Sequence, residues 1–222
     1  MNITAKLLSK FPLLEILSEN ELKLSVPNVR TQTIHKGEIL YVQGETSDKL
    51  YFVIDGWFKT EKIATDGRQT TLRFIGPGEL INELAVFSKV DNAVSVIAME
   101  EGKVFYLFQS YVEQLLETNS KFSRAVVESL AVRIQYLLEQ IEDLSFYTVD
   151  VRLARFLLLQ ADGNIWNRQS WITQTEMAAR LGTVLDVVNR NLQKFVRDGL
   201  IEIQRDKITI VDRNRLEEIA QG

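Results

Sequence analysis

The sequence contains no cysteine and only one histidine, His35, among its 222 residues. The lack of cysteine excludes disulfide bonds, iron–sulfur clusters and thiolate zinc sites. One histidine cannot build a metal centre from several imidazoles, and its place beside the Lys36-Gly37 turn signal indicates a surface residue rather than a haem ligand. We therefore expect neither a metal nor a cofactor.

Long apolar runs are also missing. No stretch of about 18 apolar residues occurs, and no basic-plus-apolar leader opens the chain. The sequence predicts neither membrane spanning nor secretion, so we expect a cytoplasmic protein. Nor is there a nucleophile–base pair or a phosphate-binding loop in the right context, so the sequence does not predict an enzyme.

The charge of the chain is small but unevenly distributed. The net charge of −4 argues against a protein that coats nucleic acid broadly. Residues 1–149 hold 15 Lys and Arg against 20 Asp and Glu, whereas residues 150–222 hold 11 against 10. An acidic part is thus followed by a near-neutral, arginine-rich part.

The middle of the chain carries a coiled-coil pattern. Apolar residues recur there at alternating steps of three and four, the spacing of a and d positions. These residues, which we call the seam, are Val127, Leu130, Ile134, Leu137, Ile141 and Leu144. The a positions are β-branched and the d positions are leucine, which favours two parallel strands. The seam predicts a parallel homodimer, and the alternative is a helix that packs only against its own chain.

Residues 29–107 are rich in short apolar runs separated by glycine turns, a pattern typical of an antiparallel barrel or sandwich. The predicted strands are Ile39–Val42, Leu50–Ile54, Trp57–Ile63, Thr70–Ile75, Val94–Ala98 and Lys103–Leu107. Asp66-Gly67 is the clearest hairpin turn, because both central positions of a type I′ turn need positive φ. Glu79–Phe87 interrupts the strand pattern and is predicted as a short helix.

Helices are predicted on both sides of these strands. Residues 7–17 share an apolar face, but Pro12 divides them into two short pieces. Ser18 with Glu21 forms a capping box that opens a further helix. Later helices are expected at residues 109–117, from Ser120 through the seam, and from Val151 to near Gly163, with a hinge at Phe146–Val149.

The last block predicts a winged helix-turn-helix. A capping box at 173–176 opens a helix that runs through Leu181, and Gly182 ends it. Thr183, with Asp186 three residues later, opens a second helix that Gly199 closes. Two strands that form a wing and a terminal helix follow, at Ile201–Ile203, Ile208–Ile210 and Arg215–Ala220.

The second of these helices has two faces. Val188, Leu192 and Phe195 recur at i, i+4 and i+7 and should turn inward. The opposite stripe, which we call the reading face, carries Asp186, Asn189, Arg190 and Gln193. Arginine suits guanine, asparagine and glutamine suit adenine, and Leu185 or Val187 suits a thymine methyl group. Our candidate DNA-binding residues are Thr173, Thr183, Leu185, Asp186, Asn189, Arg190 and Gln193. The alternative is a solvated polar face on a helix pair that serves only packing.

Taken together, these motifs resemble the Crp/Fnr superfamily, the cyclic-AMP receptor protein and fumarate–nitrate reductase regulator family. The resemblance runs nearly end to end and rests on the order and spacing of several pieces. They are Lys36-Gly37-Glu38-Ile39-Leu40, Gly44-Glu45, Asp48-Lys49-Leu50-Tyr51, Gly56, Asp66-Gly67-Arg68, Gly76-Pro77-Gly78-Glu79-Leu80, the seam, Arg152-Leu153-Ala154-Arg155 and residues 173–209. The resemblance implies an α+β chain with three parts: a β-roll (jelly roll) of the cyclic-nucleotide-binding kind with flanking helices at 1–117, a dimerisation helix and hinge at 118–147, and a winged helix-turn-helix at 148–222.

The resemblance also places an effector cassette at residues 78–98. Within it the family's acidic contact to a ribose hydroxyl matches Glu83, which by itself is more often a solvated surface carboxylate. A glycine of the family is replaced by Asn82, the phosphate-binding arginine by Asn92 and its hydroxyl neighbour by Ala93. The candidate pocket residues are Gly78, Asn82, Glu83, Leu84, Asn92 and Ala93. On the seam helix, Leu137 and Leu138 stand where nucleotide-binding members carry hydroxyls.

An anionic phosphate without its arginine retains a large desolvation cost. Lys89 is the one substitute cation in the adjacent loop. We therefore expect a homodimeric transcription regulator that binds near-palindromic DNA, is not gated by cyclic AMP and is active without ligand, with RNA polymerase as a further candidate partner. One alternative is a neutral or apolar effector in the β-roll. Another is a cyclic-nucleotide sensor whose C-terminal domain contacts protein. Arg190 matches the family's typical base-reading arginine, while Leu185-Asp186 replaces an Arg-Glu pair, so the operator should differ from that of the cyclic-AMP receptor.

Overall fold

The computed structural model describes residues 3–65 and 69–222. The chain divides into two compact units, Met1–Gln135 and Tyr136–Gly222, which we call the N-terminal and C-terminal units and describe separately. The division falls inside the longest helix, α6 (Ser120–Phe146). The boundaries predicted at 117/118 and 147/148 remain predictions. None of the described helices is both long and apolar enough to cross a membrane.

The N-terminal unit opens with short helices, α1 (Ala5–Leu8), α2 (Pro12–Glu15) and α3 (Glu19–Ser25), and a 3₁₀ turn, η1 (Val26–Asn28). Pro12 stands at the first position of α2, where its missing N–H has no intrahelical partner to lose. The predicted break into two pieces is therefore confirmed. The predicted capping box is also present, since Ser18 accepts from the Glu21 N–H and Glu21 accepts from the Ser18 N–H at 2.7 Å.

The β-roll consists of two antiparallel four-stranded sheets. One has the order β1-β8-β3-β6 and the other β2-β7-β4-β5. The strands are β1 (Arg30–Ile34), β2 (Ile39–Tyr41), β3 (Lys49–Asp55), β4 (Phe58–Ile63), β5 (Gln69–Ile75), β6 (Leu80–Ile81), β7 (Ser95–Ala98) and β8 (Gly102–Phe108). All six predicted strands are confirmed to within two residues at each end. The hairpin turn predicted at Asp66-Gly67 lies outside the described residues.

The structure corrects the predicted helix at Glu79–Phe87. Residues 80–81 form strand β6, paired with Tyr51 and Phe52 of β3, and the helix α4 spans only Glu83–Ser88. Asn82 between them has φ +75°, a left-handed conformation that a helix cannot contain but that asparagine tolerates better than most residues. Strand β1 was not predicted, and its mostly exposed residues are placed by pairing with β8 from Arg30 to Ile34.

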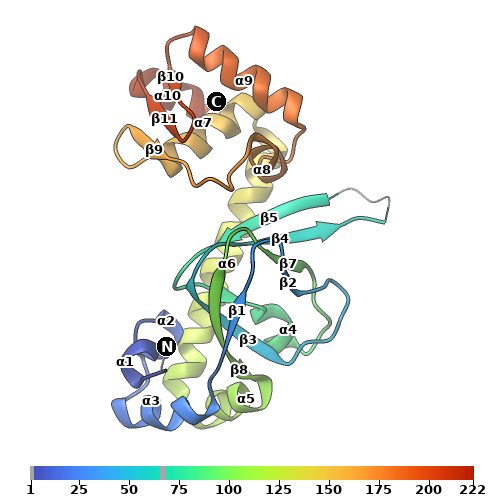
Figure 1. The fold of residues 1–222 in the computed structure, drawn as a ribbon, viewed down its shortest axis with the longest axis vertical. Helices are drawn as coiled ribbons and strands as arrows, with labels where there is room; N and C mark the ends of the chain where they lie inside the picture. The colour runs from blue at the N-terminus through green and yellow to red at the C-terminus, as the bar shows by residue number, and fades with distance from the viewer. Residues whose placement is uncertain (1–2, 66–68) are drawn as a thin grey trace. The chain divides into compact units, whose positions relative to one another are not determined.

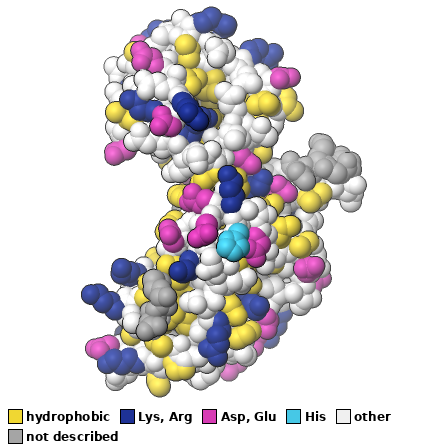
Figure 2. Space-filling model, viewed as in Figure 1, with side chains coloured by type: hydrophobic (Ala, Val, Ile, Leu, Met, Phe, Trp, Pro, Cys, Tyr) yellow, Lys and Arg dark blue, Asp and Glu magenta, His cyan; other side chains and the backbone are white. Residues whose placement is uncertain are grey.

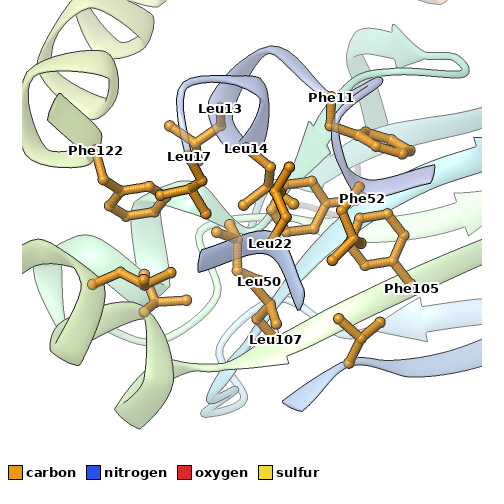
Figure 3. Packing of buried hydrophobic residues seen from close by; sticks show 14 of the residues in the cluster. Phe11, Leu13, Leu14, Leu17, Leu22, Leu50, Phe52, Phe105, Leu107 and Phe122 are labelled. Carbon is orange, nitrogen blue, oxygen red and sulfur yellow. The ribbon is translucent and has the colours of Figure 1, made fainter. Parts of the chain in front are cut away.

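One hydrophobic core of the N-terminal unit lies where the early helices meet the β3/β8 sheet and the start of α6 (Figures 1 and 3), and a second is formed by strands of both sheets of the β-roll. In the first core, Phe52 and Phe105 stack with ring centroids 4.6 Å apart, and Phe11 meets Phe105 edge-on at 4.8 Å. Phe122 and Val126 anchor α6 to this cluster, and α5 (Gln109–Thr118) contributes Val112 and Leu115. The first turns of α6 are thus held by apolar packing.

The C-terminal unit contains the end of α6, then α7 (Val149–Gln160), β9 (Ile165–Asn167), α8 (Gln174–Arg180), α9 (Leu185–Arg197), β10 (Ile201–Ile203), β11 (Lys207–Ile210) and α10 (Arg213–Gln221). The predicted wing is confirmed as β10–β11. It belongs to a three-stranded sheet with the order β10-β11-β9, so β9 is a strand that the sequence analysis missed. Its Trp166 is buried opposite Ile208 and meets Phe156 edge-on at 5.4 Å.

Candidate DNA interface and effector cassette

The helix-turn-helix consists of α8 and α9 (Figure 1). The Thr173 hydroxyl caps α8 by accepting from the Glu176 N–H at 3.1 Å. The prediction that Thr183 opens α9 is wrong, because α9 begins at Leu185 and is preceded by Val184, which makes no side-chain cap. The Thr183 N–H instead donates to the Ala178 carbonyl at 2.9 Å, which closes the turn between the helices.

The two predicted faces of α9 are present. Val188, Leu192 and Phe195 are at most 1% exposed and fix the helix in the core of its unit. On the reading face, Asp186, Arg190 and Gln193 are exposed and Asn189 is partly exposed. Leu185 is 39% exposed at the first turn of the helix. The face thus presents donors and acceptors to solvent on a helix of 13 residues, long enough to enter a major groove.

Two other cations of this unit were not in the predicted set. Arg197 is exposed seven residues after Arg190, so it extends the reading face toward the end of α9. At the wing tip, Arg205 is exposed, and its carbonyl is held by the Arg168 guanidinium at 2.7 Å. Lys194, in contrast, pairs with Asp150 of α7 at 3.4 Å. In the part of this unit that faces the viewer in Figure 2, Lys and Arg side chains alternate with acidic ones rather than forming one basic patch.

The seam residues are largely exposed in the single chain. Val127, Ile134, Leu137, Ile141 and Leu144 are 44–65% exposed, while Leu130 is half-buried against the N-terminal core. Leu138, at an e position, is 61% exposed. Apolar residues so regularly exposed along a helix are typical of a surface that pairs with another.

Asn82 and Asn92 of the cassette are turned toward their own backbone. Asn92 is 2% exposed, and its Nδ2 donates to the Val42 carbonyl at 3.1 Å. Its backbone joins the same turn, since the Asn92 N–H donates to Glu45 at 2.9 Å and its carbonyl accepts from Gly44 at 2.8 Å. Asn82 Nδ2 donates to the Lys49 carbonyl at 3.1 Å. Both amides therefore support the fold.

The other cassette residues offer little to a phosphate. Ala93 carries no side-chain donor, although its carbonyl accepts from Lys62 at 3.2 Å. Lys89 ends α4 with φ +56° and pairs with Glu113 at 2.8 Å, which raises the pKa of its ammonium group. The substitute cation considered from the sequence is thus engaged by a carboxylate of α5. Gly78, with φ +89°, forms the turn before β6, and Leu84 is 52% exposed on α4.

Arg73 of β5 is a charged group that the sequence analysis did not consider. Its side chain is 12% exposed, one terminal nitrogen donates to the Leu80 carbonyl at 2.7 Å, and the Glu79 carboxylate lies 3.9 Å away. Its buried Nε has no hydrogen-bond partner among the described residues. Arg73 and Glu83 both act on Tyr41: burial is the main cause that raises the pKa of the Tyr41 phenol, Glu83 raises it further, and Arg73 opposes. Burial also raises the pKa of Tyr51 to about 12.

His35 is a surface residue. Its side chain is 75% exposed and lies 3.5 Å from the Glu101 carboxylate, and it is visible as the cyan side chain in Figure 2. In the described part of the chain, no three His, Cys, Asp or Glu side chains gather as a metal site would require.

Comparison with known proteins shows which family the chain resembles. The model of the cyclic nucleotide-binding domain matches residues 31–119, and that of the Crp-like helix-turn-helix domain matches residues 151–219. The chain is 27% identical over 187 residues to the "CRP-like cAMP-activated global transcriptional regulator" of Mycobacterium tuberculosis, covering 82% of this chain and 84% of that protein. It is 26% identical to the "Cyclic AMP receptor protein" of Thermus thermophilus, covering 95% and 97%.

Solved structures agree in fold. FixK2 from Bradyrhizobium japonicum superposes with a TM-score of 0.76 at 20% identity, covering 86% of this chain and 96% of that one. The Catabolite Activator Protein of Thermus thermophilus gives a TM-score of 0.55 at 25% identity, covering 95% and 99%. With both domain families matched in order, and with its β-roll, long helix and helix-turn-helix in place, the chain belongs to the Crp/Fnr superfamily of DNA-binding transcription regulators.

Proposed function

We propose that the protein is a homodimeric, sequence-specific regulator that binds near-palindromic DNA through α9. The observation that carries the proposal is the division of α9 into a buried apolar face and an exposed polar face that contains Arg190. A helix that docked on another protein would have no need of such a polar stripe, and its Arg, Asn and Gln side chains are those that suit base edges in a major groove. Each dimer contacts two half-sites roughly 34–36 Å apart, one turn of the double helix.

The dimer forms through α6. Five of the six seam residues are at least 44% exposed in the single chain, and burying them between two copies removes apolar surface from water at every turn. Their β-branched a positions and leucine d positions favour a parallel pair. Two parallel copies place two reading faces about a twofold axis, which matches the symmetry of a near-palindrome.

A substitution at the seam tests the dimer. Ile134→Asp introduces a charge at the proposed axis and should cost several kcal/mol of dimer stability, of the order of 3–5 kcal/mol. Val132→Asp is the matched control, because Val132 is 69% exposed on the same helix but lies outside the seam. In sedimentation equilibrium at micromolar concentration, we expect a dimer for the wild type and the control and a monomer for Ile134→Asp. A monomeric wild type would contradict the proposal.

We further propose that cyclic AMP does not gate this regulator and that it binds DNA without ligand. Asn92 and Ala93 leave the cassette without the guanidinium and hydroxyl, Lys89 is paired with Glu113, and Leu137 and Leu138 carry no hydroxyl. Arg73 does not replace the missing cation, because one of its nitrogens donates to the Leu80 carbonyl and Glu79 faces the same guanidinium. In this proposal the cellular concentration of the regulator itself controls how much of its operator DNA is occupied.

Two measurements test this second proposal. Operators are first selected from a random duplex pool, and binding to them is then measured with and without cyclic AMP or cyclic GMP. We expect equal operator affinity in both conditions and no heat of cyclic-nucleotide binding in titration calorimetry. Micromolar cyclic-nucleotide binding, or operator binding that appears only with the nucleotide, would overturn it. Contact with RNA polymerase and a cytoplasmic location stay predictions.

A further inference from the structure

The last part of α6 belongs to the same compact unit as the helix-turn-helix. Within that part, Tyr136, Gln140 and Asp143 follow one another at steps of four and three, so they lie on one face of the helix. These three polar side chains meet arginines from α7 and α8 of their own unit. Seam residues 137, 141 and 144 lie on the same part of α6, so this C-terminal half of the seam and the reading face belong to one compact unit.

Arg180 joins α8 to α6. It is the last residue of α8, and its two terminal nitrogens donate to different turns of α6, one to the Gln140 side-chain carbonyl and the other to the Tyr136 hydroxyl at 2.5 Å. Its guanidinium also lies 5.7 Å from the centroid of the Tyr136 ring. Because the planar guanidinium donates to two acceptors on successive turns of α6, it restrains both the distance and the rotation between α8 and α6.

Two further contacts lie along the same junction. A Cβ built on Gly182, just after α8, would stand 2.7 Å from the Leu144 side chain, so the turn of the helix-turn-helix approaches α6 closely. Arg155 of α7 donates to Asp143 at 2.5 Å and lies 3.7 Å over the Tyr147 ring. The end of α6 thus contacts α7, α8 and the turn between α8 and α9.

We propose that Arg180 is a positioning residue that fixes the direction of α9 relative to the C-terminal half of the seam, and thereby the half-site spacing that the dimer accepts. The inference rests on the proposed function, because it needs two reading faces on one DNA. It assigns Arg180 no contact with DNA. Because α8 and α9 pack as one hairpin, an angle fixed between α8 and α6 is carried to the reading face.

The test separates geometry from affinity. Operators are prepared with the selected half-site spacing and with one base pair inserted or deleted, together with a duplex carrying a single half-site. A one-base-pair change turns one half-site out of phase, so the wild type should bind the altered spacings at least about tenfold more weakly. Arg180→Met, which keeps an unbranched apolar stem, should reduce this discrimination to about threefold or less while single-half-site binding stays within about twofold.

The controls keep the result interpretable. Tyr136→Phe removes one acceptor of Arg180 and should shift discrimination in the same direction by a smaller factor, even if Arg180→Met folds poorly. Glu142→Gln, at an exposed position of α6, should leave discrimination unchanged. If the wild type enriched no sequence from the random duplex pool, the proposed function would be refuted. If the wild type, Arg180→Met and Tyr136→Phe discriminated equally well between spacings, only the positioning role would be refuted. The same would follow if Arg180→Met lost affinity equally for the single half-site and for the full site.

Discussion

The effector cassette and the reading face are both polar segments, but they use their polar side chains differently. Those of the cassette bind the backbone of their own unit, whereas those of the reading face lie in solvent. In the cassette, Asn82 and Asn92 are at most 7% exposed and donate to the carbonyls of Lys49 and Val42. On α9, Asp186 and Arg190 remain in solvent. Polar groups that satisfy their own backbone stabilise a fold, whereas polar groups left in water are available to a partner. This comparison underlies our proposal that the N-terminal unit has kept the fold of a cyclic nucleotide-binding domain without its phosphate-binding groups, while the C-terminal unit binds DNA.

The comparison predicts that Arg190→Ala lowers DNA affinity without lowering stability. Removing one bidentate contact should cost about 1–3 kcal/mol of binding free energy and relax one base position of the operator. Urea unfolding should be nearly unchanged, because the side chain is exposed. Competition binding with operators changed one base pair at a time measures both effects.

The control for Arg190 is Lys194→Ala on the same helix. Lys194 is turned to Asp150 of α7, so its loss should leave the base preference intact. If Arg190→Ala weakened all sequences equally, Arg190 would be a phosphate contact instead of a base contact.

A substitution at Gly182 tests how much the stability depends on the close approach of the α8–α9 turn to α6. Its φ is +62°, and a methyl group there would meet Leu144. Gly182→Ala should lower the free energy of unfolding by roughly 1–2 kcal/mol for the left-handed backbone, with a further loss for displacing Leu144.

Gly163→Ala is the matched control for Gly182→Ala. Its φ is +58°, and a Cβ there would meet no atom within 4 Å. The difference between the two variants in urea unfolding isolates the Leu144 contact. Equal losses would show that this contact contributes nothing.

Asn92→Ala is the converse of the Arg190 substitution. It leaves the Val42 carbonyl without its amide donor, but it also removes the buried Oδ1, which has no partner among the described residues. We expect a loss of about 1 kcal/mol in the free energy of unfolding and no change in operator affinity. Ala93→Ser serves as the neighbouring control. A loss of DNA binding in a folded Asn92→Ala protein would show that the cassette still communicates with the reader.

Much of this architecture was predictable because the patterns are local. The buried face of α9, the two pieces around Pro12 and the capping box at Ser18 each depend on spacings within one or two turns. The exposed seam is equally visible in the sequence, since its heptad spacing extends over 18 residues.

The features that sequence reasoning missed depend on distant partners. Strand β1 has a single fully buried residue, Ile34, and is placed by β8, some 70 residues away. Buried Arg73 donates to the Leu80 carbonyl across a turn, and no residue spacing in the sequence predicts such a contact. Arg180 lies in a predicted helix, but its partners Tyr136 and Gln140 lie about 40 residues earlier in the chain. Local spacing therefore predicts the elements and their faces, whereas tertiary packing decides which polar groups are left for a ligand.

The smallest expected effect concerns the charge pair between Lys194 of α9 and Asp150 of α7. Asp150 accepts from the Thr148 hydroxyl at 2.5 Å and faces Lys194, and these contacts lower the pKa of its carboxyl group below the ordinary value of 3.8, the Thr148 hydrogen bond being the larger cause. A lowered folded-state pKa means that the stabilisation is present above the unfolded pKa and is lost as the pH falls through the folded one. Because the Asp150 side chain is 31% exposed, Asp150→Asn should cost no more than about 1 kcal/mol at pH 7. Thermal unfolding of the wild type and the variant should differ at pH 7 and converge as the pH falls through the lowered pKa of the Asp150 carboxyl group. A difference that persisted at low pH would mean that the introduced amide fails for steric reasons and that the charge of Asp150 does not hold α7 against α9.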